Sequence, residues 1–291
     1  MFIATLIAKD ELRRGDISAA ADALRQSGLA PGAAEWIDEG SACDLAFTGD
    51  PAEARSALEA LGGDVVVQPS AGRRRAMLVA DMDSTMIDVE CIDELADYAG
   101  VREQVAAVTE RAMLGELDFE GALDERVALL KDLDEKIIDL CREERVRLMP
   151  GARTLAQTMR ANRAYLLLVS GGFTRFAEPV ADAIGFDEVA SNFLIIEEGR
   201  LTGAVRKPIV DAHGKLEAMI RATAARGLTL DQVLAVGDGA NDVPMLAAAG
   251  LGIAFRARPA AAAAADARID HNDLTALLYA QGYRRSEWVE A

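Results

Sequence analysis

Two aspartates one residue apart, Asp81 and Asp83, come directly after a short apolar run at residues 76–80. A short apolar run of this kind predicts a buried parallel strand. Because strand side chains alternate, extended backbone would place both carboxylates on one side of the strand's C-terminal end. Such a pair can share a metal ion, divide nucleophilic and acid–base work, or do both. From the pair alone, a turn that caps the following helix is an equally good interpretation.

Two further apolar runs end in groups suited to phosphate chemistry. Residues 165–169 lead into Ser-Gly-Gly at 170–172, a hydroxyl followed by residues that let backbone N–H groups approach a ligand. Residues 233–236 lead into a segment that contains Asp238 and Asp242. Ligands of open α/β sheets bind at the carboxyl ends of the strands, so we expect these segments to meet there.

A lysine lies between these two runs. Lys215 opens a helical pattern in which apolar residues recur at helical spacing through Thr223. Taken singly, such a lysine usually faces solvent, and Asp242 would serve equally well to cap a helix that begins at Val243. The interest therefore lies in the combination of these residues rather than in any one of them.

The order Asp, Ser, Lys, Asp resembles the haloacid dehalogenase superfamily of phosphotransferases, over most of residues 76–256. The resemblance implies that Asp81 is a nucleophile that forms an aspartyl-phosphate and that Asp83 donates and accepts the proton. It also implies a set of phosphate ligands, namely Ser170, the backbone N–H of Gly171, and Lys215.

The same resemblance implies a Mg²⁺ cofactor, which prefers octahedral oxygen ligands with one or two carboxylates. Its ligands would be the carboxylates of Asp81 and Asp238, the backbone carbonyl of Asp83, and Asp242 directly or through water. In P-type ion pumps of this superfamily a threonine occupies the place of Asp83. The aspartate in this chain predicts hydrolysis of the phospho-enzyme.

Several segments resemble the phosphoserine phosphatase family in particular: 81–100, Ala112-Met113, Phe119-Glu120, 126–131 and 209–212. This resemblance implies hydrolysis of O-phospho-L-serine to L-serine and phosphate, the last step of serine biosynthesis. Glu90 would hold the α-ammonium group and Arg126 the α-carboxylate, with Asn241 near the phosphate. Met113 and Phe119 would wall the pocket.

Arg126 also stands out by its spacing. Phe119, Leu123, Arg126, Leu130 and Leu133 follow one another at helical intervals, so the arginine lies in an otherwise apolar stripe. An arginine that flanks the stripe and extends to solvent is the alternative. A planar guanidinium suits bidentate recognition of a carboxylate better than lysine does.

Two other functions remain open. A related phosphatase or phosphotransferase acting on another small phosphomonoester would share the core residues and differ in its use of Glu90 and Arg126. An amino-acid-binding regulatory protein with an inert core would have no need of the complete set of aspartates, serine and lysine.

The element pattern predicts three parts. Residues 1–72 read β-α-β-β-α-β, a ferredoxin-like α+β order that resembles an ACT domain, a small amino-acid-sensing module. Residues 73–291 read as a doubly wound α/β core with a parallel sheet, interrupted at about 90–149 by helical sequence that we expect to form a cap. The segment 69–72 reads as a linker, and Arg73 to Arg75 as a solvated junction. No candidate catalytic residue precedes Asp81, so a chain that starts near Arg73 is expected to remain active if it stays soluble.

Composition narrows the class of protein. The net charge of −17 argues against nucleic-acid and acidic-membrane partners, which require a basic face. The odd and scattered cysteines, Cys43, Cys91 and Cys141, indicate reduced thiols of a cytoplasmic protein. The apolar run 2–8 is too short to cross a membrane. We expect a small-molecule substrate, no membrane, and a monomer or homo-oligomer.

Overall fold

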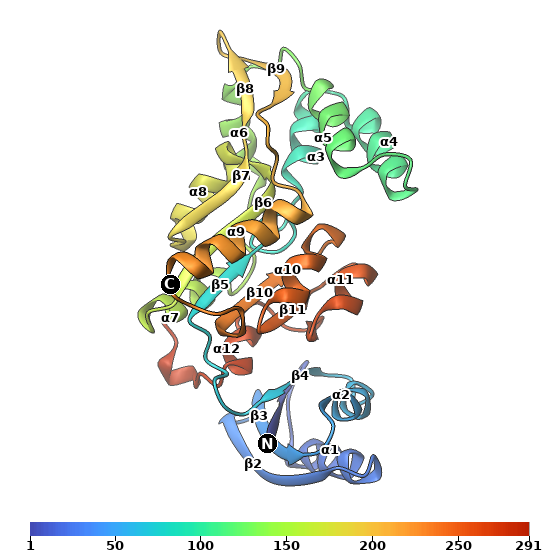
Figure 1. The fold of residues 1–291 in the computed structure, drawn as a ribbon, viewed down its shortest axis with the longest axis vertical. Coiled ribbons are helices and arrows are strands. Elements are labelled where there is room, and N and C mark those ends of the chain that lie inside the picture. Colours follow the sequence, from blue (N-terminus) through green and yellow to red (C-terminus); the bar gives the residue numbers. More distant parts are fainter. Residues whose placement is uncertain (291) are drawn as a thin grey trace.

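The computed structural model describes residues 1–290, apart from the side chain of Met113. Ten strands form one sheet in the order β2-β3-β1-β4-β12-β11-β10-β5-β6-β7 (Figure 1). Its strands are β1 (Phe2–Ile7), β2 (Ala30–Asp38), β3 (Ala42–Thr48), β4 (Asp64–Pro69), β5 (Met77–Ala80), β6 (Tyr165–Phe173), β7 (Glu188–Asn192), β10 (Val233–Gly237), β11 (Leu251–Phe255) and β12 (Ala267–Ile269). Two more strands, β8 (Leu194–Glu197) and β9 (Arg200–Val205), form a separate two-stranded sheet. The α-helices are α1 (Arg14–Gln26), α2 (Pro51–Glu59), α3 (Cys91–Tyr98), α4 (Arg102–Met113), α5 (Phe119–Ala128), α6 (Lys136–Arg145), α7 (Ala152–Ala161), α8 (Thr174–Ile184), α9 (Ala212–Ala225), α10 (Val243–Ala248), α11 (Pro259–Ala264) and α12 (Ala276–Ala280).

Six neighbouring strands, from β12 to β7, run parallel and confirm the expected doubly wound α/β core. The chain passes from β5 to β6 and β7 on one side, and later fills the other side with β10, β11 and β12. The strand order therefore reverses between β5 and β10. Ligands of doubly wound sheets bind beyond the carboxyl ends of the strands at such a point.

The core strands are apolar along their whole length because helices cover both faces of the sheet. Along β5, Leu78 and Ala80 belong to one buried apolar cluster, and Met77 and Val79 belong to the cluster on the opposite face. This alternation explains why the sequence shows an unbroken apolar run and not a polar–apolar one. The packing on both faces holds the strand ends, and with them the site, in place.

Helices α3–α6 form the expected cap, at the far end of the molecule from the N-terminal strands (Figure 1). The hairpin β8–β9, which turns at Glu198-Gly199, contacts this cap. Asp132 N–H donates to Leu201 O over 2.9 Å, and Leu201 N–H donates to Leu133 O over 3.0 Å. The hairpin is therefore attached to the cap by backbone hydrogen bonds.

The N-terminal elements follow the predicted β-α-β-β-α-β order, and their strands pair antiparallel as β2-β3-β1-β4. Asp50 caps α2 by accepting Ala52 N–H over 2.8 Å, with Pro51 in the first turn. This is the ferredoxin-like arrangement. The likeness to an ACT domain and the boundary at residue 72 stay predictions.

The expectation of a solvated junction before β5 was wrong for two of the three arginines, Arg73 and Arg75. Arg73 Nη1 lies 2.6 Å from Asp44 Oδ2, and Arg75 is 7% exposed and donates to Gln68 Oε1 over 3.1 Å. Arg74 forms an ion pair with Glu287 over 2.8 Å. Guanidinium groups withdrawn from water require such partners, so Arg73 and Arg75 join the N-terminal strands to the core, whereas Arg74 is exposed and pairs with the C-terminal segment.

The N-terminal sheet also joins the core through β4, since Val65 pairs antiparallel with Arg268 of β12. Beside this pair the Asp64 carboxylate is 3% exposed and accepts three consecutive backbone N–H groups from the core. These donors belong to Asp270 at 2.9 Å, His271 at 3.3 Å and Asn272 at 3.0 Å. A carboxylate with several N–H donors is a strong anchor between two parts of a chain.

We expect Asp64→Ala to lower the free energy of unfolding, because the three N–H groups would lose their acceptor. A buried donor left without a partner costs about 1–3 kcal/mol, and the cost is smaller for these three N–H groups because Asp270 and His271 are exposed and Asn272 is half-buried. Urea unfolding followed by circular dichroism would measure the change. Asp10→Ala, at an exposed aspartate of the β1–α1 loop, is the matched control. Equal unfolding midpoints for both variants would contradict the anchoring role.

A chain that starts at Arg73 would lack the same anchor, so its activity is informative only once its folding is verified.

Cys43, Cys91 and Cys141 are all buried free thiols, in line with the expectation of reduced cysteines. Within residues 1–290, none of the helices combines the length and the apolar character needed to cross a membrane.

Candidate active site

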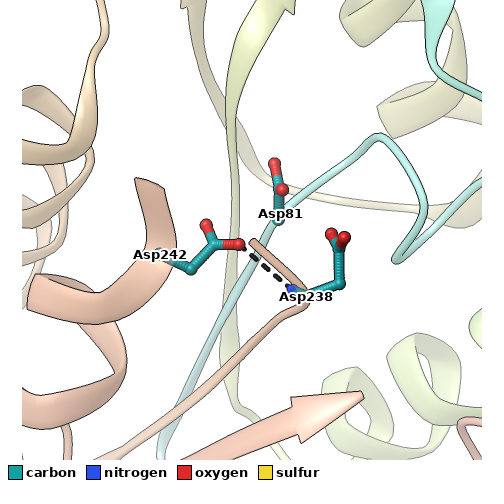
Figure 2. A group of neighbouring side chains, drawn as sticks. All are labelled: Asp81, Asp238 and Asp242. Carbon is teal, nitrogen blue, oxygen red and sulfur yellow. Dashed lines mark hydrogen bonds between the residues drawn. The ribbon is translucent and has the colours of Figure 1, made fainter. Parts of the chain in front are cut away.

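Three carboxylates gather where the strand order reverses. Asp81 follows β5, and Asp238 and Asp242 follow β10, with one oxygen of each lying within 4.8 Å of the others (Figure 2). All three side chains are buried. Like charges at this distance repel, so the cluster requires cations.

Lys215 supplies one of these cations from the first turn of α9, which Asp211 caps by accepting Gly214 N–H over 2.8 Å. Its Nζ lies 2.6 Å from Asp81 Oδ1 and 2.7 Å from Asp242 Oδ1, with the lysine fully buried. Burial disfavours its charge, but the two carboxylates outweigh burial and raise the pKa of Lys215. The solvent-facing alternative for this lysine is therefore wrong.

Asp242 is held by the loop that follows β10. Its Oδ2 accepts the N–H groups of Asp238 at 3.1 Å and Gly239 at 3.0 Å, and its side chain makes no capping bond to α10. The helix-cap interpretation is therefore wrong. Since both of its oxygens already accept hydrogen bonds, Asp242 shapes the loop as well as adding charge.

Asp81 and Asp238 each keep an oxygen that accepts no hydrogen bond from residues 1–290. Asp81 Oδ1 accepts Met82 N–H over 2.7 Å as well as Lys215, and Asp238 Oδ1 accepts Thr85 Oγ1–H over 3.2 Å. Burial, and then the charge of Asp242, hold the pKa of Asp81 well above its usual range and raise that of Asp238 to about 6. Buried carboxylates with oxygens to spare fit the oxygen-rich site that Mg²⁺ prefers.

Asp83 lies in the turn after β5, because the strand ends at Ala80 and not beyond the first aspartate. Its Oδ1 accepts Cys91 N–H over 3.3 Å. Burial, and then the charge of Glu90, raise the pKa of Asp83 to about 7. A carboxyl group with this pKa can both donate and accept a proton near neutral pH.

The Ser-Gly-Gly segment lies inside β6 and not at its end as predicted, because the strand continues to Phe173. Its pairing with β7 is irregular between Val169 and Phe173, so 170–172 bulge out of the ladder. A Cβ at Gly171 would lie 2.9 Å from Phe119 Cζ of the cap, and one at Gly172 would lie 2.8 Å from Asp83 Oδ2. A side chain at Gly171 or Gly172 would therefore force Phe119 or Asp83 to move.

A cavity of about 380 Å³ lies between the cap and the strand ends. It brings together seven of the predicted site residues: Asp81, Asp83, Glu90, Arg126, Gly171, Asp238 and Asn241. The other three predicted residues, Ser170, Lys215 and Asp242, are buried and do not line the cavity. Phe119 lines the cavity as expected, and the side chain of Met113 falls outside the described part of the chain.

The cap side of the cavity holds one anion and one cation. Glu90 Oε1 accepts Ser84 Oγ–H over 2.8 Å, which fixes its orientation. Arg126 donates from Nε to Ala122 O over 3.1 Å and forms no ion pair with any residue in the range 1–290. Burial lowers the pKa of Arg126, although the negative charges of Asp93 and Glu90 act to raise it. The arginine therefore faces the cavity, and the solvent-facing alternative is wrong.

Sequence reasoning assigned no role to Asp93, Thr109 and Arg258, which also line the cavity. Arg258 carries one detectable signal, since it follows β11 at the same edge of the sheet as the aspartates. Its backbone N–H donates to Asp238 O over 2.9 Å. Thr109 carries no such signal, because its place in the cavity depends on how the cap packs.

The fold and this site define a class of protein. A sequence model of the haloacid dehalogenase-like hydrolases matches residues 78–247. The chain belongs to this family.

Within the family, the chain is similar to proteins named phosphoserine phosphatase. It is 47% identical to the one from Streptomyces coelicolor over 80% of this chain and 57% of that protein. It is 41% identical to the one from Archaeoglobus fulgidus over 78% of this chain and 68% of that protein. The unliganded structure of a probable phosphoserine phosphatase from Vibrio cholerae is 33% identical, with a TM-score of 0.78 over 98% of this chain and 87% of that one. The chain thus spans little more than half the length of the Streptomyces protein.

Proposed function

We propose that this protein is a phosphoserine phosphatase that hydrolyses O-phospho-L-serine to L-serine and phosphate. One observation carries the proposal. A single cavity has on its cap side an oriented Glu90 and a half-buried Arg126 that forms no ion pair within residues 1–290, with Asp81 and Asp83 lining it at the strand ends. An amino acid esterified with phosphate offers the matching groups, namely a carboxylate, an ammonium and a phosphoryl group. The names of the relatives support the same substrate.

In the first step, the free Oδ2 of Asp81 attacks phosphorus and the bond from phosphorus to the serine oxygen breaks. Asp83 gives its proton to that oxygen, which would otherwise leave as an alkoxide. In the second step, Asp83 takes a proton from water, and the water oxygen attacks the aspartyl-phosphate. Phosphate leaves and Asp81 is restored as a carboxylate.

Lys215 and the bulge at 170–172 stabilise the charge that builds on the phosphoryl oxygens. Mg²⁺ would be held by Asp81, Asp238 and the backbone carbonyl of Asp83, with Asp242 supporting it directly or through water. When bound, it supplies positive charge that lets an anionic nucleophile meet a phosphate dianion. The raised pKa values of the buried aspartates support a cation at this position.

The proposal predicts phosphate release from phosphoserine that depends on Mg²⁺ and on the amino-acid part of the substrate. A panel of L- and D-phosphoserine, phosphothreonine, glycerol phosphate and an aryl phosphate, each with Mg²⁺ or with EDTA, would test this. Phosphoserine should give the highest kcat/KM, and EDTA should abolish its turnover. A preference for a substrate without the amino acid would favour another phosphomonoesterase of the family.

Metal binding should also stabilise the fold. The folded-state pKa of Asp238 is about 6, above its ordinary 3.8, so stability falls as pH rises from about 4 to 6. Above pH 6 Asp238 is ionised in the folded protein, and the full cost of its buried charge lowers the free energy of unfolding. A cation bound to this carboxylate should offset that cost. At pH 7.5 we expect Mg²⁺ at 100 times its Kd to add about 2.7 kcal/mol to the free energy of unfolding. Asp238→Asn should reduce the corresponding rise in Tm, and an equal rise in that variant would place the metal elsewhere.

A further inference from the structure

The bulge in β6 leaves backbone groups without partners in the sheet. Val169 pairs with Ala190 and Phe173 pairs with Asn192, so three residues of β6 face a single residue of β7. Polar backbone groups in such a bulge require partners from outside the ladder, because leaving them buried and unpaired costs free energy.

Asn192 provides one of these partners. Its side chain, in a residue only 2% exposed, donates from Nδ2 to Gly171 O over 2.9 Å and accepts Val210 N–H at Oδ1 over 2.7 Å. The two contacts also fix the orientation of the amide. Exchanging its oxygen and nitrogen would place an acceptor against the Gly171 carbonyl and a donor against the Val210 N–H.

The hydrogen bond from Asn192 to Gly171 O orients the part of the bulge that is proposed to contact phosphate. In a trans peptide the C=O and the following N–H point in opposite directions. Since the Gly171 carbonyl points at Asn192, the Gly172 N–H points away from it, and it donates to Ser170 Oγ over 2.9 Å. The peptide group between Gly171 and Gly172 therefore links the two side chains: its C=O accepts from the Asn192 amide, and its N–H donates to the Ser170 hydroxyl.

The bond to Val210 holds a second phosphate element. Val210 directly precedes Asp211, the residue that caps α9. The first turn of this helix carries Lys215, whose Nζ contacts both Asp81 and Asp242. A single buried side chain thus touches the segment that bears Ser170 and the entry to the helix that bears Lys215.

We propose that Asn192 is a positioning residue that sets the bulge at 170–172 and the start of α9 at a fixed separation, so that Ser170 and Lys215 meet the same phosphoryl group. The inference rests on the proposed function and adds a residue that the sequence motifs did not single out. It predicts that Asn192 acts on the phosphoryl group and not on the amino-acid part of the substrate.

The test compares Asn192→Ala with Ser191→Ala. Ser191 is the preceding buried residue of β7 and contacts Thr174 Oγ1 at 3.1 Å, without a side-chain hydrogen bond to Gly171 or Val210. We expect Asn192→Ala to lower kcat on the order of 100-fold, the cost of a misplacement of about 1 Å. The loss should be the same factor for phosphoserine and for an aryl phosphate. The Ki of inorganic phosphate should rise, and Ser191→Ala should leave both quantities near those of the unmodified protein.

A purely structural role would lower Tm and the amount of active protein without changing the Ki of inorganic phosphate. If Asn192→Ala fails to fold, Asn192→Asp keeps the acceptor for Val210 N–H and loses the donor to Gly171 O, so the same losses are expected. Unchanged kcat and Ki in either folded variant would overturn the inference. If the unmodified protein releases no phosphate from any ester of the panel, the proposed function fails instead.

Discussion

Asp81→Asn should abolish phosphate release while the protein stays folded. The amide has nearly the shape of the carboxylate and can still accept Met82 N–H, but it is a poor nucleophile toward phosphorus. Lys215 keeps Asp242 as a partner at 2.7 Å, so its charge is not left unpaired. In steady-state assays, the rate of phosphate release from phosphoserine and from an aryl phosphate should fall to the background rate measured without enzyme.

Asp182→Asn, at an exposed aspartate of α8, is the matched control and should retain full activity. Asp83→Asn should slow both steps, because it removes the group that protonates the leaving oxygen and activates water. Substantial turnover by a verified Asp81→Asn protein would rule out the covalent route. An unchanged rate for Asp83→Asn would mean that another group transfers the proton.

Arg126→Ala should lower kcat/KM for phosphoserine by about two to three and a half powers of ten. The substrate carboxylate would be enclosed beneath the cap without a partner, and breaking such a buried pair costs roughly 3–5 kcal/mol, with 1.4 kcal/mol for each power of ten. An aryl phosphate has no carboxylate, so its hydrolysis should change far less. The ratio of the two kcat/KM values is the measurement.

Arg111→Ala is the matched control for this prediction. Arg111 is also a cap arginine, but it pairs with Glu125 at 2.6 Å and does not line the cavity. Glu90→Gln should shift the ratio in the same direction as Arg126→Ala, more weakly, because the amide still accepts a hydrogen bond from the ammonium. If both variants slowed the two substrates equally, these residues would serve cap closure or folding and not recognition.

The parts of the fold that depend on local pattern could be predicted from the sequence. Buried strands leave unbroken apolar runs, so β5, β6 and β10 were located, and their shared carboxyl edge brought Asp81 and Asp238 together as expected. For the strands, one short segment carries the whole signal. Lys215 was identified only from its place in the order Asp, Ser, Lys, Asp, because a lysine at the start of a helix carries no such signal alone.

Features made by distant segments could not be predicted. The partners of Arg73 and Arg75 lie in other elements, and an isolated basic triplet looks the same whether it is solvated or paired. The bulge at 170–172 depends on the register against β7, which no local pattern specifies. Asn192 was missed for the same reason, since its role exists only where β6, β7 and the loop before α9 meet.

The pairing of β4 with β12 has a consequence for solubility. Without it, β12 would be the last strand of the parallel sheet and would present unpaired backbone N–H and C=O groups. Such an edge is a template for strands of other copies of the chain. The N-terminal strands cover it with a partner from the same molecule. At the new outer edge, β2 carries Pro31 and pairs irregularly with β3, features that discourage further strands from adding.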